Sequence, residues 1–206
     1  MPLVPKSRPS IEPIPADTYQ AVCYAVVDLG THLNEKWKTE QQKILIAWEI
    51  PSVRYKYERD GTQFDEARVI AKKYTFSYAE NAYLFKDLTN WRGKPFTEDE
   101  IKSFDIFKVL KQNCMLQIIH TENNQKTYAN VSGVVKLPAG MKLIEPEHTV
   151  IQYSMQENEG DLSGLPEWVG GFKVKDIIAE SIEFKGDPAP QNTDSDLAPT
   201  EDDIPF

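Results

Sequence analysis

Basic residues stand beside aromatic residues in four separate stretches of this chain of 206 residues. Such pairs could hold a nucleic-acid single strand, because cations contact phosphates and aromatic faces stack bases at about 1–3 kcal/mol per base, whatever the base. The candidate nucleic-acid-binding residues are Trp37, Lys38, Lys43, Arg54, Tyr55, Lys56, Tyr57, Arg59, Lys72, Lys73, Tyr74, Lys126 and Tyr128. The pattern by itself does not separate DNA from RNA.

The sequence gives little support for a metal site, a phosphate-binding loop or a catalytic nucleophile. His32, His120 and His148 lie far apart and lack the spacing of metal ligands, and no glycine-rich phosphate loop or GxSxG motif occurs. The acidic run 98–100 fits charges that stabilise the start of a helix. We therefore expect no catalytic residue, no metal and no cofactor. An enzyme acting on nucleic acid would need carboxylates clustered around a metal, and it remains a third hypothesis.

Composition and charge narrow the classes further. The formal net charge is −9, but six of the 32 acidic residues lie in 186–206, where no Lys or Arg occurs. The remaining body is close to neutral, so it can still carry a basic groove. No run of about 18 apolar residues is present, and the first 17 residues lack the apolar segment of a signal peptide. We expect a cytoplasmic protein without a membrane anchor.

The two cysteines, Cys23 and Cys114, lie in apolar stretches far apart in the chain. We expect buried, reduced thiols, since disulfides are rare in intracellular proteins. A disulfide between them is the alternative.

Five segments read as β-strands: residues 18–29, 42–50, 67–76, 114–120 and 126–137. Alternation in the second segment puts Ile44 and Trp48 on one face, and Pro51 is expected to end it. Residues 30–41 are expected to form a loop, and Asp60-Gly61 a turn. A short strand is expected over 149–153.

Helical spacing appears between the third and fourth predicted strands. Ser77 and Glu80 have capping-box spacing before a helix through Trp91, which Gly93 should end. Thr97 opens a second helix through about residue 110, and 172–184 reads as a third. This order predicts a mainly β fold with helices: an OB-fold-like five-stranded barrel with a helical insertion between strands three and four, plus a disordered acidic C-terminal tail.

Several of the candidate aromatic residues have a structural alternative. Tyr74 and Phe76 share a face, and either could belong to the barrel core instead of a binding surface. Trp48 and Trp91 fit core positions better than a stacking platform. Residues 54–59 could form an ordinary solvated hairpin, since long Lys and Arg side chains cover much protein surface.

The end of the chain carries a motif that charge alone does not explain. Its last five residues are Asp202, Asp203, Ile204, Pro205 and Phe206, and a solubilising tail has no need of the apolar ones. This sequence, DDIPF, resembles the C-terminal tip of bacterial and phage single-stranded DNA-binding proteins. In that family an OB-fold is followed by a flexible acidic linker and a tip that docks partner proteins of replication, recombination and repair.

The resemblance implies a partner-docking role for the same five residues. A terminal Phe can enter an apolar pocket while carboxylates meet a basic rim. The body, with the stretch KKYTFSYAENAYLFKDLTNWRGKPFTEDE, is similar to divergent single-strand binders of tailed bacteriophages. The expected DNA contacts therefore rest on strand placement, and only the tail role is carried over.

These features predict a protein without enzymatic activity that coats and protects single-stranded DNA in phage replication and recombination. Its expected parts are a flexible N-terminal arm (1–15), a single-strand-binding domain with a C-terminal extension (16–185) and the docking tail (186–206). The tail could also compete with DNA for a basic groove. The alternative is an adaptor that captures host repair or replication proteins by tail mimicry and binds no DNA. Self-association is left open.

Overall fold

The computed structural model describes residues 12–59 and 61–184. Their elements, in chain order, are β1 Thr18–Asn34, β2 Thr39–Arg59, β3 Thr62–Thr75, α1 Tyr83–Arg92, α2 Glu98–Lys102, the 3-10 helix η1 Ile106–Val109, β4 Asn113–Asn123, β5 Lys126–Lys136, β6 Ile151–Tyr153, β7 Trp168–Val169, β8 Phe172–Lys173 and α3 Val174–Ala179. Within those ranges, every helix is too short or too polar to cross a lipid bilayer.

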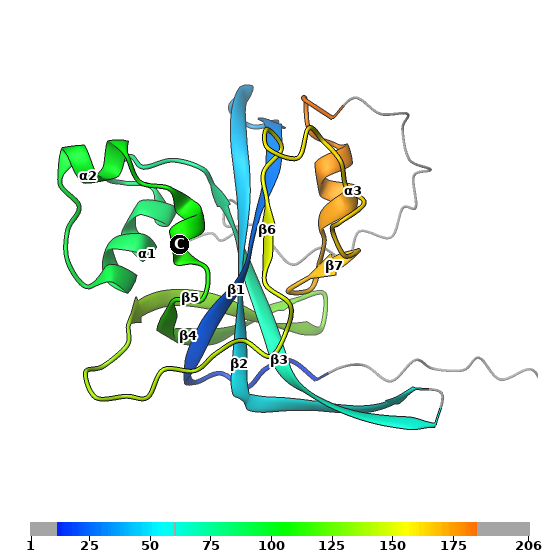
Figure 1. The fold of residues 1–206 in the computed structure, drawn as a ribbon. Helices are drawn as coiled ribbons and strands as arrows, with labels where there is room; N and C mark the ends of the chain where they lie inside the picture. Colours follow the sequence, from blue (N-terminus) through cyan, green and yellow to red (C-terminus); the bar gives the residue numbers. More distant parts are fainter. Residues whose placement is uncertain (1–11, 60, 185–206) are drawn as a thin grey trace, which may run out of the picture.

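The five long strands form one antiparallel sheet in the order β3-β2-β1-β4-β5 (Figure 1), and β6 pairs in parallel with β1. All five predicted strands are present, so the mainly β class is confirmed. In the described chain no hydrogen-bonded ladder joins the edge strands β3 and β5, so the sheet is open. The predicted OB-fold barrel is not confirmed.

Two strands are longer than the sequence pattern indicates. Residues 30–41 were expected to be a loop, but β1 runs to Asn34 and β2 begins at Thr39, because the ladder continues to the pair of Asn34 and Thr39. Pro51 does not end β2 either. The register with β3 jumps from Ile50 to Arg54, so Pro51 lies in a bulge where its missing N–H costs no ladder bond.

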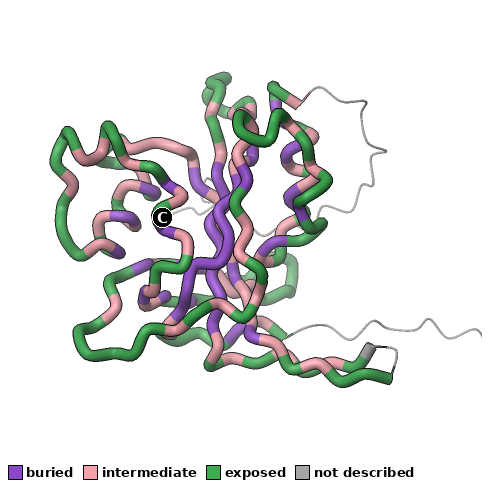
Figure 2. The backbone as a smooth tube through the Cα atoms, viewed as in Figure 1, coloured by how far each residue is buried: buried purple, intermediate pink, exposed green. Residues whose placement is uncertain are grey.

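One face of the sheet holds the main core. Figure 2 shows the buried residues of both faces in purple along the central strands. Trp48 is fully buried and its ring lies 5.8 Å from that of Trp91 on α1. The indole N–H of Trp91 donates to the Asn113 carbonyl oxygen at 2.9 Å, which fixes α1 against β4. Cys23 and Cys114 lie in the same core, both buried and free, as predicted.

The helical insertion is built from shorter pieces than predicted. Ser77 does not cap α1: its hydroxyl accepts from Ala79 N–H, and the helix begins only at Tyr83. The predicted end at Gly93 is confirmed by its left-handed φ of 73°.

The second predicted helix has the right start and the wrong length. The capping box of Thr97 and Glu100 is confirmed, but α2 ends at Lys102. Asp105 then accepts a hydrogen bond from Phe107 N–H and starts the separate turn η1.

The other face of β1, β2 and β3 is covered by the C-terminal extension, which we define as residues 151–184. Val174 and Ile178 of α3 are fully buried in a second core with Leu45 and Ala47 of β2. Figure 1 shows this extension and the helices α1 and α2 on opposite sides of the central strands. The helix predicted over 172–184 is only six residues long, because Phe172–Lys173 pairs with Trp168–Val169 as a small hairpin.

Candidate nucleic-acid interface

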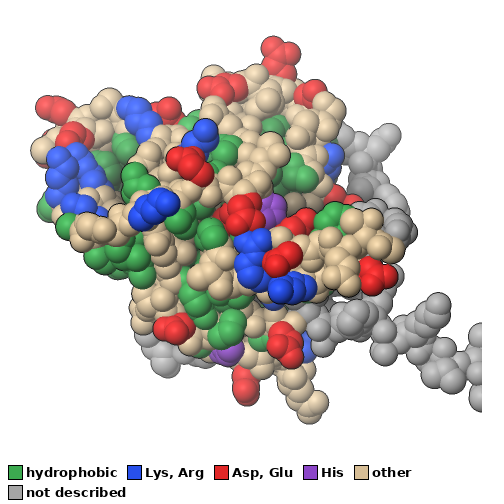
Figure 3. All heavy atoms as spheres, turned by 60° about the horizontal axis from the view of Figure 1, so that its bottom comes forward, with side chains coloured by type: hydrophobic (Ala, Val, Ile, Leu, Met, Phe, Trp, Pro, Cys, Tyr) green, Lys and Arg blue, Asp and Glu red, His purple; other side chains and the backbone are tan. Residues whose placement is uncertain are grey.

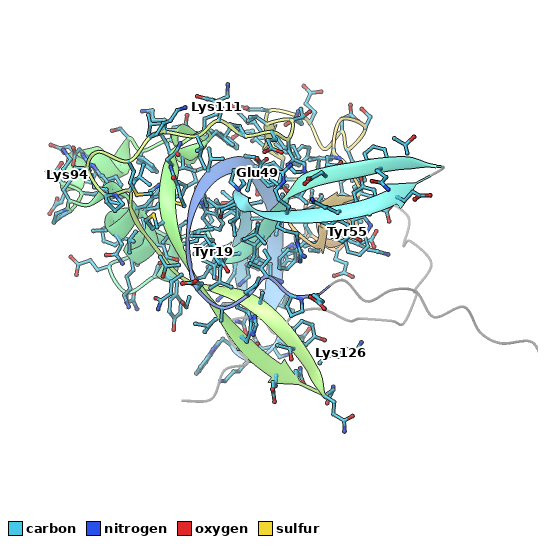
Figure 4. All side chains as sticks on the ribbon, turned by 90° about the horizontal axis from the view of Figure 1, so that it is seen from below. Tyr19, Glu49, Tyr55, Lys94, Lys111 and Lys126 are labelled. Carbon is cyan, nitrogen blue, oxygen red and sulfur yellow. The ribbon has the colours of Figure 1, made fainter. Side chains whose placement is uncertain are left out.

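The β2–β3 hairpin projects beyond the sheet, and it carries the predicted binding residues between Arg54 and Arg59. We define the hairpin arm as residues 54–59 and 62–67, paired from Arg54 opposite Ala67 to Arg59 opposite Thr62. Figure 1 shows the arm extending away from the body, and Figure 4 shows it from below, with Tyr55 labelled. Since side chains alternate along a strand, the arm has two different faces.

One face of the arm is an aromatic ladder of Tyr55, Tyr57 and Phe64. The ring centroid of Tyr57 lies 5.1 Å from Tyr55 and 4.9 Å from Phe64, with interplanar angles of 26° and 12°. The guanidinium of Arg68 lies 5.6 Å from the Tyr55 ring centroid. All three aromatic side chains are half-buried, so part of each ring faces solvent. A stacked row with a cation at one end suits a single strand of bases.

The opposite face of the arm is charged. Arg54 donates to Asp65 and to Glu147, each over 2.7 Å, and also to the carbonyl oxygen of Asp65 at 2.6 Å. These bonds raise the pKa of the Arg54 guanidinium, with the Glu147 bond the larger cause, and they hold the pKa of Asp65 and Glu147 below the usual range. Lys56 forms a longer ion pair with Asp65, at 3.5 Å, and is 75% exposed, so a phosphate can compete for its ammonium.

The β1–β2 turn lies at the far end of β2 from the hairpin arm. Trp37 is 67% exposed there, with the Lys36 ammonium 5.2 Å from its ring centroid. Lys38 forms an exposed ion pair with Glu35 at 2.7 Å. Lys43 donates to Gln41 and to the hydroxyl of Thr75, each over 2.8 Å. These residues form a second group, separated from the arm by the covered middle of β2.

The third predicted stretch, in β3, lies largely within the fold. Tyr74 is 1% exposed, and its hydroxyl donates to Asp87 over 2.8 Å. Lys72 is on the same strand face and pairs with the same carboxylate at 3.0 Å. The core alternative is therefore the correct one for Tyr74, whose ring cannot stack a base while buried. Lys73 lies opposite Leu45 on the other strand face and is half-buried.

The fourth stretch lies at the tip of a different hairpin. Lys126 and Tyr128 begin β5, opposite Asn123 and Thr121, with Lys126 exposed and Tyr128 half-buried. Figure 4 shows the β4–β5 hairpin as a second projection, with Lys126 at its tip, apart from the arm that carries Tyr55. A strand held by both would have to cross from one hairpin to the other.

Two sets of predicted residues lie outside the structural description. One is the side chain of Arg59. The other is the docking tail, which lies beyond the described residues and consists of Asp202, Asp203, Ile204, Pro205 and Phe206.

The C-terminal extension explains why the predicted residues do not form one surface. Its Gly170 packs so closely on Ala71 that a Cβ added there would come within 2.3 Å of the Ala71 Cβ. The Gly170 N–H also donates to the Tyr24 hydroxyl over 3.1 Å. The middle of β2 and β3, where the sequence placed a binding face, is covered by the protein itself.

Phe64 and Arg68 are the residues that sequence reasoning missed. The Asp60-Gly61 turn predicts a hairpin, and a two-residue turn in that register places Phe64 across from Tyr57. That signal could have extended the aromatic row onto β3.

The surface charge is mixed. On the face shown in Figure 3, Lys and Arg side chains stand beside Asp and Glu side chains, without an unbroken basic stripe.

In the described part of the chain, no group of three or more His, Cys, Asp or Glu side chains is placed to hold a metal ion. No protein-family model matches the chain, and no curated protein matches it.

Proposed function

We propose that this protein binds single-stranded DNA without strong sequence preference, and that the hairpin arm is its main contact. The observation that carries the proposal is the aromatic ladder of Tyr55, Tyr57 and Phe64 with Arg68 beside it. A projecting two-stranded hairpin has no core of its own, so three stacked rings on it are partly open to solvent. Bases can add to such a row at about 1–3 kcal/mol each.

The charged face of the arm supplies the phosphate contacts. Lys56 is exposed, whereas Arg54 is held by two carboxylates. A phosphate at Arg54 would have to compete with Asp65 and Glu147. Binding should therefore be moderate in strength and weaken with salt, since each phosphate contact contributes about −0.7 to the slope of log K against log salt concentration.

The fold is compatible with this role. An open five-stranded antiparallel sheet with a helix between its third and fourth strands is what a partly open OB-fold would contain, and such folds bind oligonucleotides. The acidic DDIPF tail would recruit replication, recombination and repair proteins to the coated strand, with no covalent chemistry in the chain itself.

Fluorescence-anisotropy titration of labelled oligo-dT, with duplex and RNA competitors at several salt concentrations, tests the proposal. Binding of moderate strength that duplex does not compete away, and that weakens with salt, is the expected result. Absence of binding even at low salt would reject it. The adaptor hypothesis would then be pursued by pull-down of partner proteins with and without Phe206.

A further inference from the structure

An open cleft of about 800 Å³ lies far from the hairpin arm. Its walls come from four parts of the chain: β1 and β2 around Asp28 and Gln42, Phe76 just after β3, residues 104–107 at the start of η1, and residues 154–160 and 183–184 of the C-terminal extension. A cleft of this volume is in the range of specific binding sites.

The lining of the cleft combines apolar rings with negative charge. Four phenylalanines, Ile44, Ile106 and Met155 supply apolar surface, and the carboxylates are Asp28, Asp105, Glu159 and Glu183. No Lys or Arg of the described chain lines it. A phosphate would be repelled here, while an apolar segment that carries Lys or Arg would be attracted. We call this site the acidic cleft.

The two chain ends beyond the described residues differ sharply in charge. Residues 186–206 carry six acids and no base, so the acidic cleft repels them although Phe184 lies in its wall. The segment 1–11, MPLVPKSRPSI, carries Lys6 and Arg8 without any acid, beside the apolar Leu3 and Val4. We propose that the acidic cleft binds segment 1–11 of a second copy of this chain.

The chain's own segment 1–11 starts from the wrong end of the sheet. The Glu12 carbonyl oxygen accepts from Arg68 over 2.9 Å, and Arg68 pairs with Ile50 on β2. Gln42, at the cleft, lies eight residues earlier on β2, about 26 Å along the strand at ~3.3 Å per residue. Figure 1 shows the first described residues beneath the sheet and the β1–β2 turn at its upper end.

Reach decides between the two sources of this segment. Lys6 is six residues before Glu12, so a fully extended backbone places its Cα at most about 20 Å away, and only the Lys side chain adds to that reach. Full extension would therefore just bring its ammonium to the near wall of the cleft at Ile44, six residues from Ile50 on β2. A chain that must pass around the sheet has less reach than that. A neighbouring copy has no such restriction, so the basic residues that enter the cleft come from a neighbour.

The biological purpose of this association rests on the proposed function, because copies linked in this way would coat a DNA strand cooperatively. The association itself needs no nucleic acid, so it is measured on the full chain alone by sedimentation velocity across protein and salt concentrations. Reversible association that weakens with salt is expected. A protein that fails to bind DNA could still associate, so failure of either idea is seen separately.

Charge reversal identifies the surfaces. The double variant Lys6→Glu/Arg8→Glu and the single variant Glu159→Lys should each weaken association by more than about tenfold, since like charges facing each other cost several kcal/mol. Mixing these two variants should restore association through one contact, because the unaltered basic segment 1–11 of Glu159→Lys then meets the unaltered acidic cleft of the double variant. Glu157→Lys is the matched control: Glu157 is exposed on the same 154–160 segment but does not line the cleft, and its variant should associate as the unaltered chain does.

Isotope mixing separates a neighbour's segment from the chain's own. Carbodiimide cross-linking of equal amounts of ¹⁴N- and ¹⁵N-labelled chain should give Lys6–Glu159 peptide pairs of mixed label. The proposal is overturned by links that carry only one label within each pair, by a chain that stays monomeric at every concentration, or by charge-reversed variants that associate normally.

Discussion

The ring of Tyr57 stacks on that of Phe64 across the β2–β3 hairpin, with centroids 4.9 Å apart and planes only 12° from parallel. The two residues are directly paired in the ladder, so the stack is fixed by the register of the hairpin and not by a neighbouring core. Tyr55 extends the row by one ring. This arrangement gives the proposed DNA contact a rigid platform, which lowers the entropy that binding would otherwise cost.

Removing the central ring should show how much the ladder contributes. Tyr57→Ala is expected to weaken oligo-dT binding by about 1–3 kcal/mol, roughly five- to 150-fold, because one stacking face is lost. Tyr57→Phe keeps the stacking face and removes the hydroxyl, which donates to Glu66 over 3.1 Å, so its affinity should stay close to that of the unaltered chain. Anisotropy titration at fixed salt measures both.

A matched aromatic elsewhere serves as the control for Tyr57. Trp168 is 54% exposed, with the Lys173 ammonium 5.2 Å from its ring centroid, but it lies on the C-terminal extension. Trp168→Ala should leave oligo-dT affinity unchanged. An equal loss for both variants would mean that the ladder has no special role.

The charge of Lys56 should appear in the salt dependence. Lys56→Ala is expected to reduce the slope of log K against log salt concentration by about 0.7, the value for one phosphate contact on a single strand. Lys102 on α2 is similarly exposed, at 71%, and is paired with Glu98. Lys102→Ala should keep the original slope, and a slope that does not change for Lys56→Ala would remove this residue from the interface.

Tyr74 should matter for stability and not for binding. Its buried hydroxyl donates to Asp87, so Tyr74→Phe should lower the free energy of unfolding by about 1.5–3 kcal/mol, the size of a lost hydrogen bond to a charged group. Urea unfolding measures that loss, and oligo-dT affinity should stay within about twofold. Weaker DNA binding without a change in stability would instead place Tyr74 at the interface.

The strands could be predicted from the sequence because β-branched and aromatic residues run through them. Ile44, Ile46 and Trp48 are all buried on one face of β2, as the pattern indicates. The ends of the elements could not be predicted in the same way. The bulge that keeps Pro51 within β2 depends on the pairing partner, and α2 stops at Lys102 because Asp105 starts a new turn.

The candidate site could be predicted only in part, because local patterns do not show how distant segments pack together. Local spacing located the basic and aromatic residues, but it did not say which of them share a surface. Tyr74 has the same residue types around it as Tyr57, yet it lies on the strand face that turns toward α1 and Asp87. The covering of Leu45 by Val174 and Ile178 depends on how the C-terminal extension docks, which no local pattern reports.

The docking of the C-terminal extension can be tested at two neighbouring glycines. Gly170 has a φ of 56° and touches Ala71, whereas Gly171 has a φ of 95° and no atom within 4 Å of its added Cβ. Gly171→Ala should cost only the backbone strain, about 1–2 kcal/mol. Gly170→Ala should cost about 2–4 kcal/mol, because the clash with Ala71 adds to the strain. Equal costs in urea unfolding would mean that the extension does not press on β3.

Acid should weaken the link between the two helices of the insertion. Arg92 binds both carboxylate oxygens of Glu100, and this pairing, together with the Thr97 N–H, lowers the pKa of Glu100 from 4.5 to about 2. Because the folded pKa lies below the unfolded one, Glu100 contributes its full stabilisation above about pH 4.5 and loses it as the pH falls toward 2. Glu100→Gln should therefore lower Tm at neutral pH and flatten the dependence of Tm on pH between about 4.5 and 2. Arg92→Gln should also flatten the dependence of Tm on pH, since this variant removes the larger cause of the lowered Glu100 pKa.

Thermal unfolding followed by circular dichroism between about pH 4.5 and 2 measures the dependence. If Tm falls as steeply in both variants as in the unaltered chain, the pair of Arg92 and Glu100 does not link stability to pH.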